Sequence, residues 1–506
     1  MRSEKSVKNS LYAIVGQAVS LIFGFITRIV FANKLGDDYL GINNIFYSVL
    51  SLLSLTELGM GAAFTFALYK PIAEDDKERI GRVMNLYAVA YRIVAAAVTV
   101  IGLCLVPFLP LITESVPDIP HITVIYLLFL VNSAASYLFS YKRALITASQ
   151  QDYKNSVNTS VFAIVQNAVQ LVLLMTTGSF VLYLAAQLVC TVASNLAISY
   201  TAGRMFPYLG SIKGLPERSE LTAIKANVKA MFMTRFGSVA VTGTDNLLIA
   251  TVGVALVGVY SNYLLLLQTI GTILTQVVNA VTASVGNLIA EGSERRGEIY
   301  KNIIFAMAWL YGFSAIALDT LMGRFVGLVF GGDWLLAETA VHIMAANFLI
   351  SGIRQTNQMF INAGGLFDPV KWRGFAEAAV NLAASALLLF VFDMGLIGVL
   401  LGTTVSHLVV GIVWETLTVD RHCVKGGGAK FIRLGLLYTA VTAVVWLING
   451  AVCSLIPRTL PGFVLAVAVT AVLPNALFLA LSAKTSELAF FIGIARRMVG
   501  KVTRRG

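Results

Sequence analysis

The chain has 506 residues, of which 57% are hydrophobic and only 12% are charged, and its formal net charge is +11. A soluble domain averages about 25% charged residues, whereas a membrane span needs ~20 consecutive apolar residues. This composition excludes a soluble globular protein and predicts an all-α polytopic membrane protein.

Apolar stretches separated by short polar hinges predict fourteen transmembrane helices. Several exceed the minimum length of a span, which indicates tilt or projection beyond the bilayer. The first stretch is too long for the core of a cleaved signal peptide, so we expect it to remain as a helix. In chain order the helices are expected at 10–33, 41–69, 83–108, 122–148, 157–177, 180–203, 228–253, 259–290, 302–328, 338–363, 374–392, 397–419, 434–456 and 462–482.

An internal repeat relates two parts of the chain, because residues 28–85 align without a gap with residues 245–302. In this register Gly36 and Gly41 fall on Gly253 and Gly258, and Arg28 falls on Asp245. Such a repeat is typical of transporters whose working site lies between two like halves. It predicts two pseudo-symmetric six-helix lobes at 1–215 and 216–430, two additional helices within 431–483, and a basic amphipathic cytoplasmic tail at 484–506.

The basic residues predict the orientation of these helices. Lys34, Arg324 and Arg458 lie on one side, whereas most of the 37 Lys and Arg residues lie on the other side, together with the N-terminus. Both termini are therefore expected in the cytoplasm. The asymmetry accounts for most of the net charge, so the charge does not indicate nucleic-acid binding. The apolar face of the tail, with Leu488 and Phe491, is predicted to lie on anionic membrane lipid; a docking site for a partner enzyme is the alternative.

Among the charged residues inside predicted helices, six are singled out, because a charge there requires a partner, an aqueous cavity or an anionic ligand. Arginines outnumber acids among them, and the guanidinium group binds phosphate or carboxylate while keeping its charge. They predict a cationic, substrate-binding cavity for an anionic cargo; fixed ion pairs between helices are the alternative. The six are Arg28, Glu57, Arg92, Arg235, Asp245 and Arg354.

Polar residues recur at helical spacing along the first, second, seventh and eighth predicted helices. Small and hydroxyl residues often only join helices, but larger polar side chains in these stripes are expected to line the cavity. They are Gln17, Tyr47, Gln268 and Asn279. Arg28 and Asp245 also lie near the outer ends of matching helices, and we predict that they form an outer gate pair.

No cofactor or enzyme activity is expected from the remaining residues. Four cysteines and four histidines are too scattered to indicate a metal site, and GGGAK at 426–430 lacks the spacing of a phosphate-binding loop. A membrane glycosyltransferase or polymerase would need acidic residues on sizeable outer loops, and the predicted outer loops are short.

Residues 26–76 read ITRIVFANKLGDDYLGINNIFYSVLSLLSLTELGMGAAFTFALYKPIAEDD, and residues 377–409 read EAAVNLAASALLLFVFDMGLIGVLLGTTVSHLV. The first segment resembles the opening of Wzx-type polysaccharide flippases, and the second resembles the matching part of their second lobe. The TELG and LYKP segments are similar to those of Gram-positive capsule and teichuronic-type exporters. Their superfamily also holds multidrug exporters and the lipid II flippase.

The resemblance implies a V-shaped pair of lobes in the bacterial plasma membrane and alternating access. It also implies the transport of undecaprenyl-diphosphate-linked oligosaccharide to the outer leaflet, with Arg28, Glu57 and Asp245 lining the central cavity. Two alternatives share the fold: a lipid II flippase and a cation-coupled multidrug exporter. The second should have an acidic cavity, whereas arginine prevails among the residues above.

Overall fold

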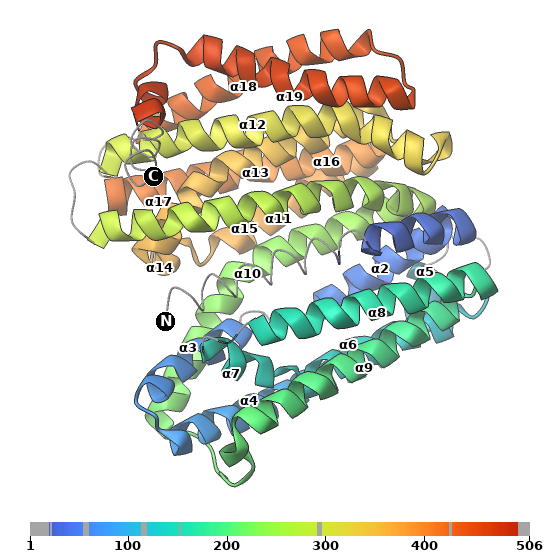
Figure 1. Ribbon diagram of the computed structural model, residues 1–506, viewed down its shortest axis with the longest axis vertical. Helices are drawn as coiled ribbons and strands as arrows, with labels where there is room; N and C mark the ends of the chain where they lie inside the picture. Colours follow the sequence, from blue (N-terminus) through green and yellow to red (C-terminus); the bar gives the residue numbers. More distant parts are fainter. Residues whose placement is uncertain are drawn as a thin grey trace, which may run out of the picture. The chain divides into compact units, whose positions relative to one another are not determined.

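A computed structural model describes residues 20, 23–53, 60–112, 119–149, 151, 153–290, 296–424 and 428–493. All regular structure in these residues is helical (Figure 1), as the composition predicted. Besides residues 23–35, the helices are α2 (Asp37–Leu53), α3 (Met60–Ala73), α4 (Lys77–Leu105), α5 (Leu109–Ile112), α6 (Ile122–Ser140), α7 (Lys142–Ala148), α8 (Tyr153–Thr177), α9 (Phe180–Met205), α10 (Arg218–Val252), α11 (Val254–Ala290), α12 (Arg296–Val329), α13 (Glu338–Gly364), α14 (Phe367–Val370), α15 (Arg373–Ala386), α16 (Gly395–Ser406), α17 (Val413–Val419), α18 (Gly428–Ser454) and α19 (Leu460–Ser482).

Nine helices in the described part of the chain are long and apolar enough to cross a membrane, or ten if the bent pair α6 and α7 forms one span. This number is compatible with the fourteen predicted spans, because the first two predicted helices include residues outside the description. Helices extend beyond their apolar stretches; α10 begins at Arg218, whereas its apolar pattern begins at 228. Hydropathy underestimates the length of such helices, because a polar helical turn can project past the bilayer.

The repeat register is visible in the helix boundaries. Asp37, where α2 begins, matches Val254, where α11 begins, and both helices follow a break at a glycine of the repeat. At the first break Gly36 has a φ of 90°, in the left-handed region that glycine adopts readily. The two hinges therefore occur at equivalent positions of the two repeats.

The matching glycines Gly41 and Gly258 lie against each other where α2 meets the first turn of α11. A Cβ atom on Gly41 would lie 2.1 Å from the carbonyl oxygen of Val254, and one on Gly258 would lie 2.3 Å from that of Asp37. Glycine is required at both positions because the two backbones leave no space for a side chain.

Contacts divide the chain into two compact units, Met1–Gly258 and Val259–Gly506. The predicted lobe boundary at residue 215 stays a prediction. Helix α10, which follows that boundary, packs against α2 and α3 within the first unit. Asn246 of α10 donates a hydrogen bond to Ser48 of α2 at 2.8 Å. In the second unit, α18 and α19 both pack on α12 (Figure 1).

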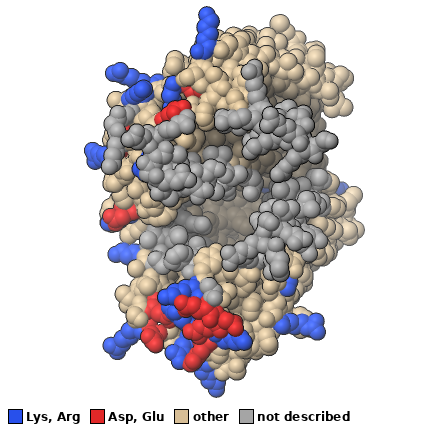
Figure 2. Space-filling view, turned by 60° about the vertical axis from the view of Figure 1, so that its left-hand side comes forward, with Lys and Arg blue, Asp and Glu red and all other residues tan. Residues whose placement is uncertain are grey.

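Acidic and basic side chains gather where the turn before α4 meets the start of α10, and Figure 2 shows such a cluster on the face it presents. Asp76 caps α4 by accepting the backbone N–H of Arg79 at 3.0 Å. The Arg79 side chain pairs with Glu220 of α10. This pair connects two segments 141 residues apart within the first unit.

The start of the C-terminal tail packs on the protein. Leu488 is buried in the apolar core of the second unit, and Phe491 stacks on Phe305 with ring centroids 6.2 Å apart. Next to Leu488 in the chain, Glu487 accepts hydrogen bonds from the Tyr438 hydroxyl at 2.8 Å and from Lys301 Nζ at 2.9 Å. The sequence predicted that Leu488 and Phe491 lie on lipid, but both contact the protein. The rest of the predicted lipid-binding face lies in residues 494–506, outside the described residues.

The Glu487 cluster predicts acid sensitivity. Burial alone would raise the pKa of Glu487, but hydrogen bonds from Lys301 and Tyr438 prevail and lower it. A lowered folded-state pKa means that the stabilisation is present above the unfolded-state pKa and is lost as pH falls through the folded-state pKa. We expect Glu487→Gln to lower the melting temperature at pH 7, because hydrogen bonds to a charged group contribute about 1.5–3 kcal/mol. The difference from the wild type should shrink below pH ~4; a difference independent of pH would contradict the assignment.

Candidate functional site

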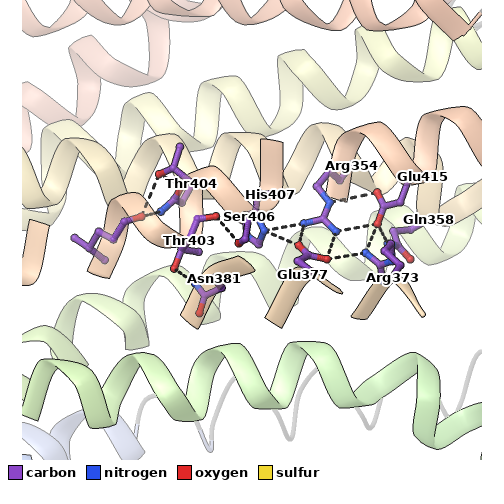
Figure 3. Close-up of polar contacts among 12 residues, drawn as sticks. Arg354, Gln358, Arg373, Glu377, Asn381, Thr403, Thr404, Ser406, His407 and Glu415 are labelled. Carbon is purple, nitrogen blue, oxygen red and sulfur yellow. Dashed lines mark hydrogen bonds and ion pairs between the residues drawn. The ribbon is translucent and has the colours of Figure 1, made fainter. Parts of the chain in front are cut away.

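A cluster of charged residues lies inside the second unit (Figure 3). Arg354 of α13 is at its centre, between Glu377 of α15 and Glu415 of α17. Its Nη2 donates to Glu377 Oε2 and Glu415 Oε1, both at 2.9 Å, and its Nε donates to Glu415 Oε2 at 3.2 Å. Arg373 pairs with both carboxylates, and its Nη1 lies 3.2 Å from Glu377 Oε2.

Local backbone geometry brings the cluster together. Residues His407–Ile412 form a wide π-helical turn between α16 and α17, and such turns are frequent at functional sites. Gly411 of this turn leaves space for the guanidinium group, since a Cβ atom there would lie 2.4 Å from Arg354 Cζ. The turn also places His407 Nδ1 2.8 Å from both Glu377 Oε1 and Arg354 Nη1.

His407 cannot use both of these contacts as hydrogen bonds in one state. A protonated Nδ1 donates to the carboxylate of Glu377, whereas an unprotonated Nδ1 accepts from the guanidinium of Arg354. The histidine therefore joins the cluster in either state. Its ring is largely buried, with 16% of the side chain exposed.

The cluster changes the interpretation of Arg354. The sequence predicted a cargo-binding cation, but Arg354 is 7% exposed and Glu415 is fully buried beside it. Two arginines face two glutamates, so their formal charges cancel, and the Arg354 donors are directed at protein partners. This geometry favours the alternative of a fixed ion pair between helices, and a cargo-binding role of Arg354 stays a prediction. Sequence reasoning missed Arg373, Glu377 and Glu415, which lie near the ends of predicted helices and resembled ordinary end charges.

The other predicted charges lie in the first unit. Arg28 is half-buried in the helix over 23–35, Asp245 is buried in α10, and Arg92 is exposed in α4. The proposed outer pair of Arg28 and Asp245 stays a prediction. Four predicted residues lie outside the description: the positions of Gln17 and Glu57, and the side chains of Arg235 and Asn279.

The two remaining predicted polar residues face open space. Tyr47 of α2 is 46% exposed, and its hydroxyl accepts a hydrogen bond from Gln187 Nε2 at 2.6 Å. Gln268 of α11 lines a pocket of about 420 Å³ in the second unit. This pocket also has walls from α12 and α13, contributed by Tyr311 and Gln355 respectively. A role of either residue in cargo binding stays a prediction.

Comparison with known proteins adds a family match and several similar folds. A family model described as MatE matches residues 13–173. An inward-facing multidrug resistance MATE family transporter of the MOP superfamily has a TM-score of 0.62 at 13% identity, over 83% of this chain and 99% of that chain. The chain has a MATE transporter fold.

Two further structures share this fold. The lipid II flippase MurJ, in an inward closed conformation, has a TM-score of 0.65 at 13% identity, and the match covers 94% of this chain and 99% of MurJ. A Vibrio cholerae MATE transporter has a TM-score of 0.55 at 14% identity over 84% of this chain and 99% of its own. A comparison with curated protein sequences finds no match.

Proposed function

We propose that this protein flips undecaprenyl-diphosphate-linked oligosaccharide from the cytoplasmic to the outer leaflet of the bacterial plasma membrane by alternating access. The observation that carries a lipid-linked cargo is the extent of the likeness to MurJ. It covers 94% of this chain, whereas the two MATE transporters cover 83% and 84%.

Three features of the chain support a lipid-linked glycan as cargo. The segments 26–76 and 377–409 resemble polysaccharide flippases. Arg28 and Arg92 remain candidates for binding a diphosphate, since both lie in the first unit whereas the buried cluster around Arg354 lies in the second. The pocket beside Gln268 adds polar, uncharged groups suited to sugar hydroxyls. Polymerases or glycosyltransferases that use the flipped glycan are the proposed partners.

A cation-coupled multidrug exporter is the second candidate, and the MatE match at residues 13–173 is the observation that favours it. A lipid II flippase is the third, favoured by the likeness to MurJ. The three candidates differ in cargo, so one transport assay with three substrates distinguishes them.

The test uses the full chain in liposomes and measures outward translocation of a short-chain undecaprenyl-diphosphate oligosaccharide. We expect Arg28→Ala to lower the rate at least tenfold, because a charge-assisted contact to phosphate is worth about 1.5–3 kcal/mol. Glu57→Gln tests the second predicted cavity charge. Arg82→Ala, which removes an exposed pair with Glu78, is the matched control and should transport normally.

Efflux of an organic cation without glycolipid translocation would contradict the proposal and favour the multidrug exporter. Translocation of lipid II alone would favour the third candidate. A normal rate in Arg28→Ala, with translocation intact, would remove that residue from the cargo site.

A further inference from the structure

The pocket beside Gln268 has a chemistry different from that of the charged cluster. Its walls come from the middle parts of α11, α12 and α13, and none of its lining residues carries a charge. They offer carboxamides, hydroxyls and two aromatic rings. Transporter substrate sites of this kind lie near the middle of the bilayer. The polar members are Gln268, Thr272, Thr275, Ser351 and Gln355.

The hydrogen-bonding groups of this pocket are available to a ligand. Within the described part of the protein, the side chains of Gln268, Ser351 and Gln355 have no hydrogen-bond partner. The hydroxyls of Thr272 and Thr275 donate to carbonyl groups one turn earlier, each at 2.8 Å, so their oxygen lone pairs remain acceptors. Each carboxamide offers two donors and one acceptor. This set of donors and acceptors matches the hydroxyl groups of a sugar.

Two aromatic rings form the apolar part of the same pocket. Tyr311 and Phe348 have ring centroids 5.4 Å apart at an interplanar angle of 42°. Gly352 lets the tyrosine ring lie against the backbone of α13, since a Cβ atom there would lie 2.0 Å from Tyr311 Cγ. Tyr311 is buried and supports Phe348, which is partly exposed and presents the aromatic surface. The face of an aromatic ring is electron-rich and attracts the positively polarised C–H groups of a pyranose ring. Polar groups beside an aromatic surface are the chemistry that a sugar ring requires.

We propose that this pocket is a subsite for a neutral sugar of the cargo, and the inference rests on the proposed transport of a lipid-linked glycan. The volume of about 420 Å³ lies in the range of small-ligand sites, about 300–1,000 Å³. The lack of charged lining residues selects against uronic acids and amino sugars with a free amine. Neutral hexoses and N-acetylated hexosamines fit this chemistry. The diphosphate requires cations and therefore binds elsewhere in the protein.

The chain contains a matched control for this site. Thr269 and Thr272 are both on α11, and both hydroxyls donate to the carbonyl four residues earlier, at 2.7 and 2.8 Å. Only Thr272 lines the pocket. Replacement by valine removes the hydroxyl and keeps the shape of the side chain in both cases. A difference in ligand binding between Thr272→Val and Thr269→Val therefore reports a contact in the pocket rather than an effect on the helix.

The experiment measures equilibrium binding of two probes to the full chain in detergent: undecaprenyl diphosphate carrying a neutral disaccharide, and bare undecaprenyl diphosphate. We expect the wild type to bind the glycosylated probe more tightly. The double variant Gln268→Ala/Gln355→Ala should bind the glycosylated probe about tenfold more weakly or worse, since each lost hydrogen bond lowers the affinity a few-fold. Thr272→Val should weaken it a few-fold and Thr269→Val should not. Binding of the bare lipid should be unchanged in all variants.

Equal binding of the two probes by the wild type would overturn the subsite while leaving diphosphate recognition intact. An equal loss for both probes in the double variant would also overturn it. Failure of the wild type to bind either probe, together with binding of tetraphenylphosphonium, would contradict the proposed function itself. The bare lipid thus separates failure of the sugar subsite from failure of the proposed function.

Discussion

Replacement of Glu415 by glutamine should lower the free energy of unfolding by about 3 kcal/mol or more. Glu415 is fully buried, and it accepts hydrogen bonds from Arg354, Arg373 and Gln358. The substitution nearly preserves shape but leaves the buried Arg354 and the partly buried Arg373 facing one glutamate. An uncompensated buried charge is costly because it has lost its water without gaining a counter-charge. Thermal or denaturant unfolding of the purified protein in detergent measures the loss.

Two further variants separate charge balance from other effects. The double variant Arg354→Gln/Glu415→Gln restores the balance, and we expect it to be more stable than Glu415→Gln alone. Glu78→Gln is the matched control, because it neutralises a glutamate of a pair whose side chains are 68% and 36% exposed. Its effect should be within about 0.5 kcal/mol. Equal stabilities of Glu415→Gln and Glu78→Gln would show that the cluster is not a structural ion-pair network.

The sequence predicts helix positions well, because the length and place of each apolar stretch determine where a membrane helix lies. The apolar stretch at 462–482 becomes α19 at Leu460–Ser482, and 180–203 becomes α9 at Phe180–Met205. Helix ends outside the bilayer are predicted less well, since hydropathy does not register a polar helical turn such as the first turns of α10.

The site is less predictable because convergence of side chains is a property of packing. Arg354 was recognised as an intramembrane charge, but its partners come from two other helices. Glu377 and Glu415 lie near helix ends, and the π-helical turn that aligns them has no recognisable pattern in one sequence. Gln268 was singled out by its helical stripe, whereas Ser351 and Gln355 on the opposite wall were not. Periodicity identifies one face of one helix and does not identify the helix it meets.

The contact between the two repeat glycines provides the second large expected effect. Gly258→Ala should destabilise the first unit by about 1–3 kcal/mol, because overpacking forces the backbones apart. The added methyl group would lie 2.3 Å from the carbonyl oxygen of Asp37. The atoms nearest to it all belong to the backbone, so no flexible side chain can move away to make space. Gly41→Ala should have a similar effect from the other side of the contact, against the carbonyl oxygen of Val254. Melting temperatures of the purified variants in detergent test both.

Gly203 provides the control, because it lies within α9 and has no atom within 4 Å of an added Cβ. Gly203→Ala should be neutral or stabilising, since alanine favours a helix by about 1 kcal/mol over glycine. The double variant Gly41→Ala/Gly258→Ala should lose less than the sum of the two single losses, because one contact cannot be broken twice. Strict additivity, or single losses no larger than that of Gly203→Ala, would show that the two backbones do not touch at the repeat glycines. The non-additivity is the sharper result, because two unrelated packing defects would simply add.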